Sequence, residues 1–384
     1  MTNTEGKVEK EENVKSVQPL KSERIRESGI ELFRIITMIL IVAHHYVVNS
    51  GIMALASAKP LSLPSLFLFL FGGWGKTGIN CFVLITGYFM CKSRITTKKF
   101  LKLLLEVEFY KILFYAIFLI SGYEPFSFTG LVKSLLPIAS VGTNFTGCYL
   151  LFYLTIPFLN ILIRNMTERQ HVLLVVLLLF IYTILGTLPK FSVTMNYVTW
   201  FIVLYFISSY IRCYPKKIFE SKKVWGLSLL AITLISALSI VACTWLGTKT
   251  NSSMTFYFVS DSNRILALAT GVCAFMFFKN LTFKSKFINT IAASTFGVLL
   301  IHANSDVMRR WLWKDLLNVQ GMYSSVWLPV HAVGSVLAIF AVCTLIDFLR
   351  LQLLEKPFIK FFHQRFEAID RYIAGENKRK EESL

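Results

Sequence analysis

Long apolar segments alternate with short polar stretches along most of the chain. Segments of about 20 predominantly apolar residues are long enough to cross a bilayer as helices. The pattern therefore predicts an all-α integral membrane protein with about ten transmembrane helices. The predicted spans are residues 29–47, 77–92, 101–121, 146–164, 171–188, 196–212, 224–246, 263–279, 287–303 and 328–350.

The segments outside the predicted spans differ from one another in composition. Residues 61–75 are apolar but interrupted by proline and glycine, which favours a re-entrant or interfacial piece rather than another span. Residues 1–28 are rich in lysine and glutamate and are expected to form a disordered cytosolic tail. The spans form one membrane domain, residues 29–350, and residues 351–384 follow as a charged cytosolic tail. Apolar and basic positions at helical spacing in this tail predict an amphipathic helix on the inner membrane surface.

The formal net charge of +18 helps to predict how the chain is oriented in the membrane. In a soluble protein it would suggest nucleic-acid binding. Here the basic residues gather in alternate loops, such as 92–102 and 212–223, so we expect a lipid bilayer as partner and no nucleic acid. The asymmetry predicts that both termini lie in the cytosol. The seven cysteines are scattered without a C-x-x-C pair, so neither a disulfide scaffold nor a metal site is predicted.

The first span carries the candidate chemistry. Glu31, Arg34, His44 and His45 all lie inside it, and ionisable groups in a bilayer usually face a polar interior or a site. In a helix, Arg34 and His45 would be about 20° apart around the axis and roughly 16 Å apart along it. Glu31 shares their face, whereas His44 is turned about 80° away. A neutral histidine can accept a proton from a hydroxyl, although a buried polar pair that only joins helices remains the alternative.

Five segments resemble the membrane-bound acyltransferase 3 family, in the family's order. ELFRII…IVAHHY resembles its first span, whose hallmark is an arginine and a histidine separated by ten residues, as Arg34 and His45 are. GINCFVLITGYFM and CYLLFYLTIPFLNILI resemble later spans, STFGVLLIH resembles the segment with a late histidine, and LLEKP resembles the usual ending. The likeness runs from about Glu27 to Pro357, and the stand-alone members that modify bacterial surface polysaccharides are the most similar.

The resemblance implies a fold of about ten helices and acetyl-CoA, or another acyl-CoA, as donor substrate, with no bound cofactor. It also implies that His45 is the catalytic histidine and Arg34 its partner. We expect Glu31 to pair with Arg34. The family's tyrosine shortly before the late histidine is replaced by Leu299.

The basic loop at 92–102 is the candidate donor site. The family carries an Arg-x-x-Arg motif after the second span, and this chain has Lys99-Phe-Leu-Lys102 there. Together with Arg94, these lysines would attract the phosphates of a nucleotide-bearing donor. Ordinary anchoring by positive charge is the alternative. No Walker motif occurs, which argues against ATP hydrolysis.

His302 and Asn304 end the ninth predicted span in a polar patch. This patch is predicted either to hold a sugar acceptor or to contact lipid headgroups. We therefore predict a bacterial plasma-membrane O-acyltransferase. It would move an acetyl or other short acyl group from acyl-CoA to a hydroxyl of a cell-surface polysaccharide or its lipid-linked precursor. His45 would act as general base with support from Arg34. A transporter or flippase for a lipid-linked saccharide is the alternative, since intramembrane charges can also line a path.

Overall fold

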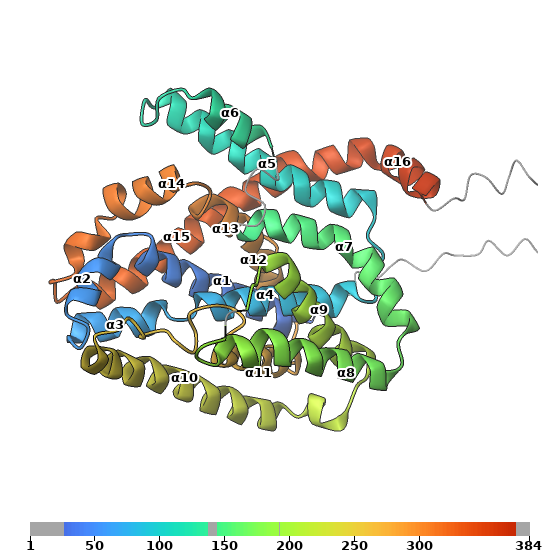
Figure 1. The fold of residues 1–384 in the computed structure, drawn as a ribbon. Coiled ribbons are helices and arrows are strands. Elements are labelled where there is room, and N and C mark those ends of the chain that lie inside the picture. Colours follow the sequence, from blue (N-terminus) through green and yellow to red (C-terminus); the bar gives the residue numbers. More distant parts are fainter. Residues whose placement is uncertain (1–26, 137–143, 192, 374–384) are drawn as a thin grey trace, which may run out of the picture.

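The computed structural model describes residues 27–136, 144–191 and 193–373, and this part of the chain is a helical bundle without strands (Figure 1). The helix α1 (Ser28–Val48) lies at its centre. Its first residue is anchored, because the Ser28 hydroxyl lies 2.8 Å from Asn289 Oδ1. The longer segments that pack around α1 include α3 (Leu63–Gly72), α4 (Gly75–Met90), α11 (Ile265–Lys279), α12 (Lys286–Ala292), α13 (Thr295–His302) and α15 (Leu328–Arg350).

Further helices enclose this centre. The helix α9 packs on α4 and α7, α10 packs on α11, and α5 contacts α6, α7 and α13. Helices α8 and α10 are mostly exposed and rich in leucine, as expected of helices that face lipid. Their bounds are α5 (Thr97–Ile120), α6 (Phe128–Leu135), α7 (Phe145–Asn165), α8 (Glu168–Leu179) with the π-helical turn η1 (Phe180–Leu185), α9 (Tyr197–Cys213) and α10 (Lys222–Thr250).

Short elements complete the bundle. They are α2 (Ile52–Ala58), the 3-10 turns η2 (Lys217–Glu220) and η4 (Val319–Met322), α14 (Asp306–Arg310) and the π-helical turn η3 (Trp311–Leu316). The helices α1, α5 and α13 run toward the same end of the bundle, where α2 and α14 also lie (Figure 1). We call this the outer end, following the predicted orientation. The inner end holds the N-termini of α1 and α5 and the C-terminus of α15.

The prediction of an all-α membrane protein is confirmed. Each predicted span coincides with a helix or a broken helix, from α1 to α15. Within the described residues, 6 helices are long and apolar enough to cross a membrane, and a pair bent by 91° (Lys286–His302 and Asp306–Leu316) would be a seventh. The count of ten and the cytosolic location of both termini stay predictions.

The segment 61–75 differs from its prediction as a separate re-entrant or interfacial piece. The structure joins α3 to α4 in one apolar stretch, Leu63–Met90. Pro64 lies in the first turn of α3, where a missing backbone N–H does no harm. The glycines serve close packing: a Cβ at Gly72 would lie 2.7 Å from Val47, and one at Gly75 would lie 2.1 Å from the His44 ring. These glycines therefore do not break the stretch but let α1 approach it closely.

The predicted amphipathic tail is a helix continuous with the last span. Through the π-helical turn η5 (Leu351–Glu355), α15 leads into α16 (Lys356–Ile373). One face of α16 packs on α5, where the Asp370 carboxylate accepts a hydrogen bond from the Thr97 backbone at 2.7 Å. The opposite face exposes Phe361 and Tyr372. Residues 1–26 and 374–384 of the predicted tails lie outside the described residues.

Candidate active site

Two histidines from distant parts of the chain meet at the outer end of the bundle. His45 Nδ1, near the end of α1, lies 2.9 Å from His302 Nε2, at the end of α13. His302 is fully buried, and its Nδ1 lies 2.6 Å from the Val298 carbonyl oxygen. His45 is only half-buried. The backbone therefore fixes the His302 side of the pair, and the His45 side stays partly accessible.

The backbone partner assigns the protons of both neutral rings. A carbonyl oxygen only accepts, so His302 Nδ1 carries a proton and donates it to Val298. His302 Nε2 is then the acceptor, and His45 Nδ1 donates to it. Among the described residues His45 Nε2 forms no hydrogen bond, so its lone pair points away from this chain of bonds as a free base.

The surroundings of the pair carry basic groups. Lys76 and Arg309 lie close enough to His45 to act on it electrostatically. Each of them also has a carboxylate partner: Asp261 lies 3.6 Å from Lys76, and Asp306 lies 2.7 Å from Arg309. These partly neutralised cations disfavour an imidazolium at His45 and favour a negative charge that develops beside it. His44 is committed elsewhere, because its Nδ1 lies 2.7 Å from the Gly72 carbonyl. Of the neighbouring histidines in α1, only His45 joins the pair.

Arg34 lies far from this pair. The unbroken helix α1 keeps Arg34 and His45 roughly 16 Å apart along its axis. Arg34 Nε lies 3.5 Å from the Glu31 carboxylate, as the sequence led us to expect, and 30% of the Arg34 side chain is exposed. In the part of the chain that the structure describes, Arg34 donates no hydrogen bond. The Arg34 guanidinium therefore has N–H donors available for a further partner. The separation also means that no small group can contact Arg34 and His45 at the same time.

A cavity of about 210 Å³ opens at the inner end between α5 and α7. Lys99 and Lys102 line it from α5 together with Glu106, and Tyr149 and Tyr153 line it from α7. The Tyr149 hydroxyl lies within electrostatic reach of Arg34. The structure therefore brings two of the predicted donor-binding lysines to one cavity, with Arg34 near its aromatic wall.

The remaining predicted residues lie apart from these two places. Arg94 is exposed, and its carbonyl accepts a hydrogen bond of 2.8 Å from Lys99 Nζ. The Asn304 amide donates to the Leu300 carbonyl at 3.0 Å and so caps α13. Neither ring nitrogen of His302 is left for a ligand, since one faces Val298 and the other His45.

A buried charge network beside the inner cavity was missed at the sequence level. Arg350, only 6% exposed, contacts Asp347 at 2.8 Å, Glu355 at 2.8 Å and Glu106 at 3.1 Å. The second Glu355 oxygen lies 2.7 Å from Lys102 Nζ. Asp347 and Arg350, three residues apart at the end of the last apolar run, were the signal that could have found it.

The fold and this site define a multi-pass membrane protein with polar groups inside its bundle. The family model described as an acyltransferase domain matches residues 27–348. The chain therefore belongs to the acyltransferase 3 family and is a membrane acyltransferase. The resemblance is confirmed for the family, and the stand-alone polysaccharide subtype stays a prediction. No curated protein and no solved structure matches the chain.

Proposed function

We propose that the protein is an O-acyltransferase that moves an acetyl or other short acyl group from acyl-CoA to a saccharide hydroxyl. The observation that carries the proposal is the hydrogen-bonded series from Val298 through His302 to His45, which leaves His45 Nε2 as a free base. Membership of an acyltransferase family supports the class of reaction. The proposed location is the plasma membrane of a bacterium, with acyl-CoA and a surface glycan or its lipid-linked precursor as partners.

The proposed reaction is a proton-coupled acyl transfer. His45 Nε2 takes the proton of the acceptor hydroxyl as its oxygen attacks the thioester carbonyl. The carbon–oxygen bond forms, the carbon–sulfur bond breaks, and the imidazolium returns the proton to the leaving CoA sulfur. Lys76 and Arg309 supply positive charge near the developing oxyanion. In this proposal His302 positions the His45 ring, a role that replaces the sugar binding expected of it.

The distance between Arg34 and His45 favours one of two possible roles for Arg34. A group roughly 16 Å from the base cannot stabilise charge at the reacting carbonyl, but it can hold a distant part of a long substrate. We assign Arg34 to the donor, with Glu31 orienting its guanidinium at 3.5 Å. Lys99 and Lys102, assisted by Arg94, attract the CoA phosphates at the inner cavity. The pantetheine arm then runs along α1 toward His45.

The test is acetyl transfer from labelled acetyl-CoA in membranes that carry matched amounts of wild-type protein, His45→Ala or His44→Ala. We expect His45→Ala to lower the rate by about 10²–10⁴-fold, the usual contribution of a general base. The His44→Ala control should lose far less, because the His44 ring is hydrogen-bonded to the backbone carbonyl of Gly72 and takes no part in the histidine pair. Undiminished transfer by His45→Ala would refute the assignment. Movement of a lipid-linked saccharide across liposomes without acyl-CoA would instead support the transporter alternative.

A further inference from the structure

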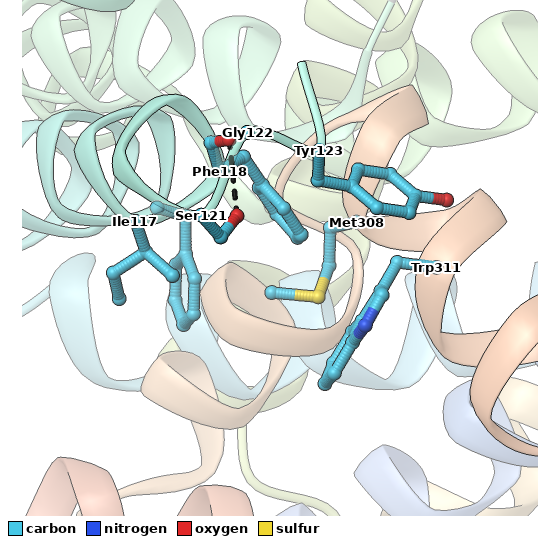
Figure 2. A pocket seen from close by; sticks show the side chains of 8 residues that line it. Ile117, Phe118, Ser121, Gly122, Tyr123, Met308 and Trp311 are labelled. Atoms are coloured by element: carbon cyan, nitrogen blue, oxygen red, sulfur yellow. Dashed lines mark hydrogen bonds between the residues drawn. The ribbon is translucent and has the colours of Figure 1, made fainter.

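A second cavity, of about 490 Å³, lies at the outer end between α5 and the α14–η3 segment. Phe114, Ile117 and Phe118 line it from α5, and Met308 and Trp311 line it from the other side (Figure 2). Tyr123 stands at its edge, just beyond the turn that ends α5. The donor proposal makes no use of this cavity.

The cavity lies at the same end of the bundle as the histidine pair. The helix α13 ends at His302, and α14 begins at Asp306 after a bend of 91°. This bend turns Met308 and Trp311 toward the end of α5, which α13 also contacts. The wall of the cavity is therefore a direct continuation of the helix that positions His45.

Aromatic rings form the inner wall of the cavity. The Phe118 ring centroid lies 5.4 Å from that of Tyr123 and 6.0 Å from that of Trp311. Figure 2 shows Tyr123 and Trp311 on one side of Met308, with Ile117 and Ser121 on the other. Tyr123 and Trp311 are partly buried, and tyrosine and tryptophan rings offer an apolar face and a polar edge. The axial C–H faces of sugar rings stack on such surfaces while their hydroxyls stay outside.

Polar groups surround the rim beside Tyr123. Arg310 Nε donates to the Tyr123 hydroxyl at 3.2 Å, and this hydroxyl donates to the Asp315 carboxylate. Arg310 also lies 3.7 Å from Glu124. Exposed contacts of this kind are weak, so they can exchange for the hydroxyls of a ligand. The rim therefore offers donors and acceptors together, as a saccharide requires.

The third side of the cavity is apolar and open. Ile117 is 44% exposed and Ile120, at the end of the same helix, is 85% exposed, and both lie in the span predicted at residues 101–121. A free saccharide gains nothing from Phe114 and Ile117, but an alkyl chain would bury their surface. We propose, building on the proposed function, that this cavity holds a lipid-linked saccharide acceptor. Its sugar lies against Tyr123 and Trp311, and its chain crosses Phe114 and Ile117.

The test is binding without acyl-CoA, measured with radiolabelled octyl β-D-glucopyranoside on protein in phospholipid nanodiscs and corrected with empty nanodiscs. We expect saturable binding that Trp311→Ala weakens at least tenfold. Trp327→Ala is the matched control, because Trp327 is an exposed tryptophan that does not line the cavity. Ser121→Trp is a second variant, which fills the cavity from an exposed position and should have the same effect as Trp311→Ala.

Two further probes separate the occupants. Octylphosphocholine has the chain without the sugar, and glucose has the sugar without the chain. We expect both to compete at least tenfold more weakly than unlabelled octyl glucoside. Equal competition by octylphosphocholine would make the cavity an ordinary lipid site, and equal competition by glucose would remove the chain from the proposal. No binding, or binding untouched by Trp311→Ala and Ser121→Trp, would overturn it.

This experiment is independent of catalysis. His45→Ala should bind octyl glucoside as the wild type does, because His45 does not line the cavity. If the wild type fails to bind octyl glucoside but transfers acetyl groups, the cavity assignment alone is refuted. If the wild type binds octyl glucoside but transfers no acetyl groups, the proposed reaction alone is refuted.

Discussion

The inner and outer ends of the bundle handle buried polar groups in opposite ways. At the inner end, Arg350 is surrounded by three carboxylates from α5, α15 and η5, and Glu355 continues to Lys102. At the outer end, the His45–His302 pair is held by a single backbone carbonyl, and Lys76 and Arg309 act on His45 only from a distance. Opposite charges in close contact fix a geometry, whereas the neutral histidine series leaves one nitrogen reactive. The difference separates a part that holds shape from a part suited to chemistry.

The largest expected effect is loss of stability on breaking the inner network. Arg350→Ala leaves Glu106, Asp347 and Glu355 without their shared cation, and removing one partner of a buried ion pair costs about 3–5 kcal/mol. We expect a large fall in the thermal unfolding temperature in detergent, or no folded protein in the membrane fraction. Arg371→Ala is the control, because Arg371 is exposed on α16. A variant at Arg350 as stable as this control would show that the network contributes little.

The next effect concerns rate and belongs to the outer end. His302→Ala removes the acceptor that orients His45 Nδ1, and we expect kcat for acetyl transfer to fall about 10–100-fold, the range for groups that orient an imidazole in metal sites. His302→Gln offers an amide oxygen to the same N–H and should recover part of the rate. KM for acetyl-CoA should stay unchanged. Equal rates for His302→Ala and the wild type would remove His302 from the mechanism.

A smaller loss of stability is expected from Gly75→Ala, which tests whether the outer end depends on close packing. A Cβ there would lie 2.1 Å from the His44 ring, and overpacking of this kind costs about 1–3 kcal/mol. Gly334→Ala in α15 is the matched control, because nothing lies within 4 Å of its Cβ. An alanine in an open helical position should be neutral or stabilising. Equal unfolding temperatures for both variants would contradict the packing role.

What the sequence predicted depended on how local each feature is. Arg34, Glu31 and His45 lie in one helix, so helical periodicity alone predicts that they share a face. The spacing also predicts the distance of about 16 Å along the axis between Arg34 and His45. The partner of His45 comes from 257 residues further along the chain. No local pattern predicts that contact, and His302 was therefore assigned to the sugar.

The same limit explains the other differences. Lys99 and Lys102 were found because basic residues stand out after an apolar span, but their cavity also needs Tyr149 and Tyr153 from α7. Glycine has the same sequence signal in a turn and at a close helix contact, so the sequence alone predicts a break at Gly72 and Gly75. Only the packing of Val47 and His44 against them tells the two apart.

The smallest expected effect is on donor binding at the edge of the inner network. Lys102 is 45% exposed and already pairs with Glu355, so its contact with a phosphate is partly screened. We expect Lys102→Ala to raise KM for acetyl-CoA about 3–10-fold at low salt, with kcat nearly unchanged, and the effect should shrink as salt rises.

Lys102→Arg keeps the charge and should retain the wild-type KM. Lys98→Ala is the control, because Lys98 lies four residues before Lys102 in the same helix and does not line the cavity. If Lys98→Ala and Lys102→Ala raise KM equally, the loop acts only through its general positive charge. If Lys102→Ala leaves KM unchanged, the Lys102–Glu355 contact has only a structural role. Donor binding would then depend on Arg34 and Lys99.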